Sequence, residues 1–503
     1  MTRTVKTLLA VGVPAAAIAC CAAAAPYYTT IAVWELRSCL PLLGVLAAVL
    51  VGAVVFGAVG LARDNDLEGI LAVAGAVAGL GAGILWAAHT SYEQDRTYLS
   101  SIRVTSDPVP TLAARAPFQV GEAQARPNLG DTSGTIVDTT YLPGEDRYAT
   151  LVERRGWLSG YEVAYTQHIP LQGRGEADRK CGFDRDRAGA RVSGYFGHNL
   201  GRLISEKQRW VRFDSGDVYA YCQSDGHPIV VVPLKRQTGV WVTTERPAGA
   251  ALYDGQTGDL TITTDTAGIP GPSYPLSLAK TQREATAASG GFWDWVFGRA
   301  GWETSDDETN AENSSEFTLS AGGSPVYVTP LTGRGSATAI SVVAVVPARH
   351  SGLSLAPVSV HRMSPVWVSL KAIEDKIRAD YQDIPNWQNI HVYEVSPSGG
   401  NGWVATLGTG QNVLYRVSGT GDLRGDKATC LLRADGTTVR CGTLAGVGGN
   451  GVGTQYGTDT PGGQGSPPPA GDLRRMSDAE LANLQQRVAA EAACRLAKTC
   501  KAG

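Results

Sequence analysis

The most constraining feature of this chain is a series of three long runs near its N-terminus that contain no Asp, Glu, Lys or Arg. In the 503-residue sequence these runs cover residues 7–34, 38–62 and 69–92. About 20 helical residues cross the hydrocarbon core of a bilayer. We therefore expect a transmembrane region over residues 1–92, with helices at about 7–27, 40–62 and 69–88. The alternative is a set of buried core helices in a soluble domain, but such long apolar runs rarely follow one another there.

The first run also resembles a secretory signal. Arg3 and Lys6 precede its apolar stretch, which ends in a short motif, Ala17 to Cys20, that resembles a lipidation site. We expect an uncleaved first helix. Three crossings from a cytoplasmic N-terminus, or two crossings after cleavage, both place residues 93–503 outside.

The basic residues that flank the spans are evenly divided between the two sides and do not decide the orientation. We therefore infer the orientation from the cysteines. Six cysteines follow the apolar region, and an even number suits an oxidising compartment. Asp435-Gly436 is a strong signal for a two-residue hairpin turn. Such a turn places Cys430 directly opposite Cys441, within disulfide reach. Reduced thiols are the alternative. We assign four residues to disulfides: Cys181, Cys222, Cys430 and Cys441.

The residue usage and the cysteines together predict a location. Arg outnumbers Lys by 34 to 10, which is typical of a bacterial genome rich in G and C. We therefore expect a protein of the bacterial cytoplasmic membrane, with the bulk of the chain extracytoplasmic. The expected spans contain no ionisable side chain, which argues against a channel or pump built on these helices alone.

A stripe of glycines in the third expected span predicts close helix packing. Gly75, Gly79 and Gly83 recur every four residues and share one helix face. This face could pack against the second span of the same chain. The other interpretation is a homo-oligomer in the membrane.

The remainder of the chain predicts a β-dominated, two-lobed extracytoplasmic domain followed by a C-terminal helix, so the fold class is a membrane-anchored α+β protein. Gly226–Arg236 resembles Gly323–Gly333, each a Gly-x-Pro turn, an apolar strand and a proline expected to end it. A further strand is expected at Val240–Thr244. The expected segments are a lead-in (93–145), a first lobe (146–290), an aromatic and acidic segment (291–316), a second lobe (317–445), a Gly/Pro linker (446–472) and an amphipathic helix (473–503).

Two segments are candidate interaction sites. The first holds Phe292, Trp293, Trp295, Phe297 and Trp302. These aromatic side chains could fill a groove between the lobes, or could dock onto a membrane or a partner. The second is the apolar stripe of the C-terminal helix, which includes Leu481, Leu484 and Val488.

No catalytic motif stands out. Ser277-Leu-Ala-Lys280 fits the Ser-x-x-Lys dyad, but its companion elements are missing. No His or Cys pair has metal-ligand spacing, so we expect no cofactor, no metal and no catalytic residues, and an enzyme is disfavoured. A pI of 6.2 excludes a bulk nucleic-acid binder.

The sequence therefore predicts a multi-pass membrane protein whose outer domain binds cell-envelope, secretion, conjugation or phage-related partners, with homo-oligomerisation as a further possibility. The alternatives are a cell-envelope hydrolase with an unrecognised site and a ligand-binding membrane sensor.

Overall fold

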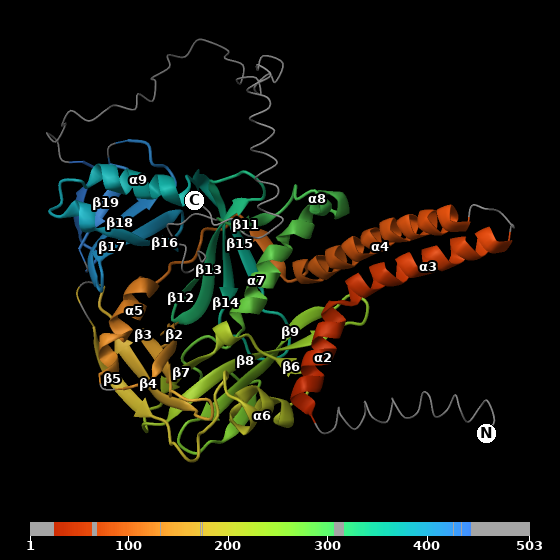
Figure 1. The fold of residues 1–503 in the computed structure, drawn as a ribbon. Helices are drawn as coiled ribbons and strands as arrows, with labels where there is room; N and C mark the ends of the chain where they lie inside the picture. Colours follow the sequence, from red (N-terminus) through yellow and green to blue (C-terminus); the bar gives the residue numbers. More distant parts are fainter. Residues whose placement is uncertain are drawn as a thin grey trace, which may run out of the picture. The chain divides into compact units, whose positions relative to one another are not determined.

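The chain adopts a mixed α+β fold dominated by antiparallel sheets, as shown by a computed structural model (Figure 1). The structure describes residues 25–62, 68–130, 132–171, 173, 175–305, 316–425, 427–433 and 435–443. The first expected span thus lies almost wholly outside the described residues, as do the Gly/Pro linker, the C-terminal helix and most of the acidic loop. The described helices are α2 (Pro26–Ser38), α3 (Leu40–Ala62), α4 (Glu68–Leu99), α5 (Phe118–Ala125), α6 (Leu200–Lys207), α7 (Leu276–Glu284), α8 (Phe292–Val296) and α9 (Leu370–Asp380).

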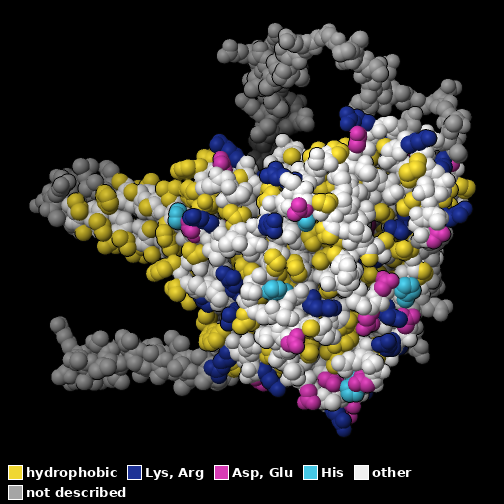
Figure 2. Space-filling view, turned by 180° about the vertical axis from the view of Figure 1, so that it is seen from behind, with side chains coloured by type: hydrophobic (Ala, Val, Ile, Leu, Met, Phe, Trp, Pro, Cys, Tyr) yellow, Lys and Arg dark blue, Asp and Glu magenta, His cyan; other side chains and the backbone are white. Residues whose placement is uncertain are grey.

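Helices α3 and α4 form an antiparallel hairpin that projects from the β-rich remainder, which we call the body (Figure 1). Among the described residues, two helical segments are long and apolar enough to cross a membrane, Leu40–Val59 and Ala72–Leu99. Hydrophobic side chains cover the surface of the hairpin, and charged side chains appear where it meets the body (Figure 2). These two helices correspond to the second and third expected spans.

The glycine stripe holds the hairpin together. A Cβ added to Gly79 would overlap the backbone of Ala48, and one added to Gly83 would overlap Val45. Gly75 lies against Gly52 in the same way. The stripe is therefore occupied by α3 of the same chain, which leaves no room on this face for the homo-oligomer contact.

Two sheets of the body share one strand order. The first runs β10 (Leu260–Thr263), β9 (Thr244–Asp254) and β8 (Pro228–Thr238), and two short strands, β7 (Tyr219–Cys222) and β6 (Val211–Arg212), line the far edge of β8. The second runs β15 (Val358–Trp367), β14 (Ile340–Pro347) and β13 (Ser324–Gly333), and β12 (Phe317–Ala321) and β11 (Trp302–Thr304) line β13. The repeated sequence therefore forms the central strand of each sheet.

The prolines in the repeat do not end these strands, contrary to expectation. Pro233 lies within β8, between the residues that pair with β7 and those that pair with β6. Pro330 occupies the same gap in β13, between the pairing segments of β12 and β11. A proline has no N–H to donate to a ladder. It is tolerated here because one edge of the strand is unpaired at that point.

The other two sheets are antiparallel meanders. One contains β2 (Thr135–Leu142), β3 (Arg147–Glu153), β4 (Tyr161–His168) and β5 (Glu176–Gly182). The other contains β16 (His391–Gly399), β17 (Gly402–Thr409), β18 (Asn412–Thr420), β19 (Thr429–Leu432) and β20 (Thr438–Cys441). The expected lead-in is not a separate unit, because its β1 (Ile102–Thr105) pairs in parallel with β15 while β2 opens the first meander.

Amphipathic α9 joins the second repeat sheet to the last meander. Ser369 caps the helix, since its Oγ accepts a hydrogen bond from the N–H of Ala372 at 3.1 Å. Its fully buried residues belong to one core cluster with Trp367 and Trp403. This core joins α9, the second repeat sheet and the last meander.

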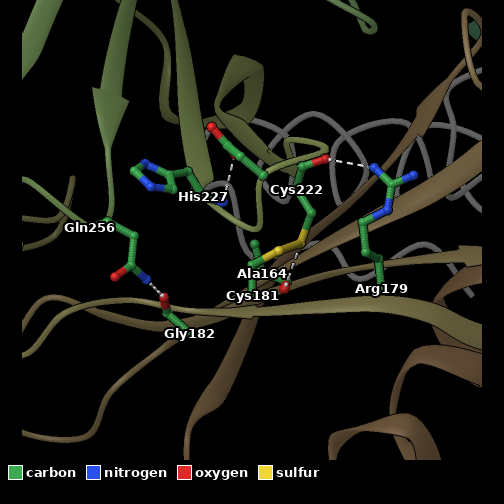
Figure 3. Close-up of a disulfide and its surroundings, with 8 residues drawn as sticks. Ala164, Arg179, Cys181, Gly182, Cys222, His227 and Gln256 are labelled. Atoms are coloured by element: carbon green, nitrogen blue, oxygen red, sulfur yellow. Dashed lines mark hydrogen bonds between the residues drawn. A yellow bond between two sulfur atoms is a disulfide. The ribbon is translucent and has the colours of Figure 1, made fainter.

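Two disulfides cross-link the body. Cys181 of β5 bridges Cys222 of β7, with a Cα–Cα distance of 5.9 Å, and thereby fastens the first meander to the first repeat sheet (Figure 3). Arg179 supports the bridge by donating a hydrogen bond of 3.1 Å to the carbonyl oxygen of Cys222. Cys430 bridges Cys441 across β19 and β20. The four cysteines assigned from the sequence form these two pairs, which suggest an oxidising, extracytoplasmic environment.

Local geometry at two turns differs from the sequence-based expectation. Arg433 donates its N–H to the carbonyl of Thr437, so the β19–β20 turn is one residue longer than expected, and a ladder irregularity restores Cys430 opposite Cys441. Residues 240–243 connect β8 to β9 and form no strand, because β8 continues to Thr238 and Gly239 turns the chain at a φ of +87°.

The two disulfides should differ in their contribution to stability. Their cysteines are 41 and 11 residues apart, and closing a longer loop removes more entropy from the unfolded chain. Replacing Cys181 and Cys222 by Ser should cost about 3–4 kcal/mol of unfolding free energy, and replacing Cys430 and Cys441 about 1 kcal/mol less. Chemical denaturation of the full chain measures both. The reverse order would contradict the assigned pairing.

The hairpin packing should depend on Gly79 and not on its neighbour Gly81. Gly79→Val forces a side chain into the backbone of α3, whereas no atom lies within 4 Å of a Cβ at Gly81. Such overpacking costs about 1–3 kcal/mol. In detergent micelles, Gly79→Val should lower the melting temperature of the full chain by several degrees, and Gly81→Val should leave it nearly unchanged. Equal effects would show that the two helices do not pack through this face.

Candidate functional site: the junction between the hairpin and the body

The two ends of the hairpin that face the body are the start of α3 and the C-terminal part of α4, and they lie side by side. The ring of Trp86 lies over Gly44, and Gly83 faces Val45, so the start of α3 lies beside the part of α4 that follows Trp86. The first ionisable residues beyond the apolar part of α4 are His89 and Glu93. The junction between the hairpin and the body therefore comprises residues 34–39 on one side and residues 89–99 on the other.

Helix α2 binds the body on the α3 side of this junction. Glu35 forms an ion pair of 2.7 Å with Arg212 of β6, and the guanidinium of Arg212 lies over the ring of Trp34 at 5.7 Å from its centroid. Trp34 is buried as a result. Arg37 donates hydrogen bonds to the carbonyl oxygens of Gln237 and Gly239, at the β8–β9 turn. These contacts fix the point at which α3 leaves the body.

The aromatic segment, residues 292–302, binds the body to α4 on the other side. The indole N–H of Trp295 donates a 2.7 Å hydrogen bond to the carboxylate of Asp95. Tyr92 meets the rings of Phe292 and Trp295 edge-on, at centroid distances of 5.6 and 6.1 Å. Figure 1 shows α8 beside α4 at its body end. The segment thus packs on α4, and not in a groove between two lobes.

The five aromatic residues singled out from the sequence fall into three groups. Phe292 and Trp295 contact α4, as described above. Trp302 belongs to β11, opposite Gly333, with Arg362 over its ring. Trp293 and Phe297 stack on one another and are each 60 % exposed. Only this last pair is available to a membrane or a partner. Leu481, Leu484 and Val488 lie outside the described residues.

A cavity of about 310 Å³ lies inside the body, where sequence analysis gave no signal. Its walls come from β2, from the turn before β7, from the segment before α7 and from β12 and β13. Arg115 and Glu316 line it, but Glu394 pairs with Arg115 at 3.1 Å and Arg283 pairs with Glu316. The remaining charged residues that line it are Asp138 and Asp217.

Burial raises the pKa of both of these carboxyls. Asp138 has a pKa of about 6, although the hydroxyl of Thr140 and the N–H of Thr139 bond to it and lower the value. Asp217 also has a pKa of about 6, and the hydroxyl of Ser277 donates to it at 2.7 Å. Neither carboxylate forms an ion pair within the part of the chain that the structure describes. The two are hydrogen-bonded to hydroxyl and backbone groups, an arrangement that sequence spacing could not reveal.

The described residues do not assemble a hydrolytic site around the Ser-x-x-Lys motif. The hydroxyl of Ser277 donates to Asp217, whereas Lys280 is exposed on α7. In a Ser-x-x-Lys dyad the lysine must lie within hydrogen-bond reach of the serine, and among the described residues no hydrogen bond joins Ser277 to Lys280. Among the described residues, no group of three His, Cys, Asp or Glu side chains is placed to hold a metal ion.

Comparison with known proteins adds no relative, because no family model, no curated protein and no solved structure matches this chain.

The raised carboxyl pKa values predict a pH-dependent effect of removing either charge. In the folded protein these groups bind protons up to about pH 6, and in the unfolded chain only up to about pH 4. The cost of ionising these two carboxyls in the folded state therefore lowers the unfolding free energy as the pH rises from about 4 to about 6. The loss of stability persists at pH values above 6. For Asp138→Asn and for Asp217→Asn, we compare the unfolding free energy of the variant with that of the wild type at each pH. This difference should favour the variant by about 1–2 kcal/mol more at pH 7.5 than at pH 4.5.

Denaturation of each variant at the two pH values measures this difference. Asp265→Asn, at an exposed position, corrects for the loss of one negative charge. A difference from the wild type that is the same at both pH values would contradict the raised pKa values.

Proposed function

We propose that this chain is an integral protein of the bacterial cytoplasmic membrane whose α3–α4 hairpin anchors an extracytoplasmic, non-enzymatic binding and assembly domain. A further span over about residues 7–27 precedes the two helices of the hairpin, so that the anchor comprises three N-terminal spans. The two repeat sheets form the cores of two lobes. Partners of the cell envelope, in a secretion, conjugation or phage-related assembly, bind the exposed surfaces of this domain.

The observation that carries this proposal is the attachment of both hairpin ends to one body. Helix α2 contacts β6 and the β8–β9 turn, and α4 contacts the aromatic segment. Because the hairpin enters and leaves on one side, α2 and the body share the same side of the bilayer. The two disulfides suggest an oxidising compartment, which supports an extracytoplasmic position for that side. A body mounted in this way suits a scaffold for partners better than a freely tethered domain does.

The absence of an assembled catalytic group among the described residues disfavours the hydrolase. The internal cavity favours a second candidate, a membrane sensor whose body binds a small molecule, because about 310 Å³ lies at the lower end of ligand-site volumes. The assembly function remains the first choice because both ends of the hairpin are held on the body, an attachment that a rigid scaffold for partners needs.

Labelling of intact spheroplasts tests the orientation. Trp157 is 82 % exposed in the β3–β4 connection of the body. In a variant with the five cysteines outside the two disulfides replaced by Ser, a cysteine introduced as Trp157→Cys should react fully with a maleimide that cannot cross the membrane. An endogenous cytoplasmic thiol protein, which should stay unlabelled, controls for leakage. Labelling of Trp157→Cys only after lysis would place the body in the cytoplasm and contradict the proposal.

A further inference from the structure

Among the exposed hydrophobic side chains of the described residues, two pairs lie in segments that contact the junction between the hairpin and the body. Trp293 and Phe297 are each 60 % exposed on the aromatic segment, and Val240 and Trp241 are 72 % and 69 % exposed at the tip of the β8–β9 turn. Large apolar side chains gathered at the surface usually mark an interaction site. The two pairs come from segments about fifty residues apart in the sequence.

Both pairs stand beside the junction between the hairpin and the body. Val240 directly follows Gly239, whose carbonyl oxygen accepts a hydrogen bond from Arg37, three residues before α3. Trp293 and Phe297 belong to the segment whose Phe292 lies 5.7 Å from His89, just past the apolar part of α4. Each pair therefore belongs to a segment that contacts a different side of this junction.

The repeat offers an internal comparison for the β8–β9 tip. The equivalent turn between β13 and β14 carries no aromatic residue and is held by hydrogen bonds, from Arg334 to the carbonyl of Glu284 and from the N–H of Gly335 to Glu303. The fold of the repeat therefore does not require an aromatic tip. At this second turn the neighbouring aromatic segment provides the exposed rings.

The chemistry of both pairs matches the boundary layer of a bilayer. Tryptophan is enriched at the headgroup level, where its ring is apolar and its N–H reaches polar groups. Arg299 lies over the ring of Phe297 at 4.8 Å, and Arg37 lies beside the Val240–Trp241 tip. Such guanidinium groups can bind lipid phosphates while the adjacent rings enter the glycerol region.

We infer that Val240, Trp241, Trp293 and Phe297 insert into the interfacial layer of the outer leaflet and hold the body at a fixed tilt on the membrane. This inference rests on the proposed membrane anchoring. The hairpin gives one attachment, and the two hydrophobic pairs give two more, one beside the α3 end and one beside the α4 end. The contacted partner is the phospholipid surface itself.

Spin-label accessibility in lipid nanodiscs tests this contact. The full chain is used with the five cysteines outside the two disulfides replaced by Ser, in nanodiscs of phosphatidylcholine and phosphatidylglycerol. Single labels are attached through Trp241→Cys, Trp293→Cys, Leu50→Cys and Trp157→Cys. Leu50 lies in α3, and Trp157 is a more exposed tryptophan of the body outside the two pairs. Relaxation by oxygen, which dissolves in lipid, is compared with relaxation by a water-soluble nickel chelate.

We expect labels at 241 and 293 to relax at least threefold more with oxygen than with the chelate, relative to the label at 157. A water-like label at either position, with the label at 50 in lipid, would overturn the two-sided contact while leaving the anchoring intact. A label shielded from both reagents would show a protein occupant and would equally overturn it. A water-like label at 50 would overturn the proposed function and this inference with it.

Discussion

The attachment of both hairpin ends to one body is the constraint on which the rest of the structure depends. An apolar two-helix hairpin has no intrinsic orientation relative to a domain that follows it. Here the ion pair of Glu35 with Arg212 holds one end, and the hydrogen bond of Trp295 with Asp95 holds the other. Each is a modest interaction by itself. Together with the buried ring of Trp34 and the aromatic contacts of Tyr92, they replace a flexible tether by a fixed junction.

The body contains two sheets with the same arrangement of strands, and each meander is fastened to one of these sheets. In both repeat sheets a long central strand is lined by two short strands, and a proline occupies the gap between them. The two meanders are joined to these sheets in different ways. The Cys181–Cys222 bridge fastens one, and the apolar face of α9 packs against the other. The cavity that holds Asp138 and Asp217, which are ionised only at a cost, is lined by the first meander and by strands of both repeat sheets.

Much of this organisation could be predicted from the sequence, because it depends on local patterns. Runs without charge marked α3 and α4, the four-residue glycine spacing marked their contact face, and Asp435-Gly436 aligned Cys430 with Cys441. The proline in the repeat was interpreted wrongly, since local sequence could not show that the strand edge was unpaired there. The contact of Trp295 with Asp95 and the meeting of Asp138 with Asp217 in one cavity join distant segments. No spacing rule encodes such contacts, and only the fold brings them together.

The central claim, a body fixed to the outer end of the hairpin, is tested most directly in native membranes by cross-linking Glu35→Cys with Arg212→Cys. The five cysteines outside the two disulfides are replaced by Ser, because Cys39 is free and lies four residues from position 35. The reagent is dibromobimane, which becomes fluorescent when both of its short arms have reacted. Because the wild-type side chains at these positions are in contact at 2.7 Å, the account predicts efficient cross-linking of this pair. The matched pair Glu35→Cys with Trp157→Cys should give only background fluorescence. Background fluorescence from both pairs would show that α2 does not bind the body in the membrane and would contradict the account.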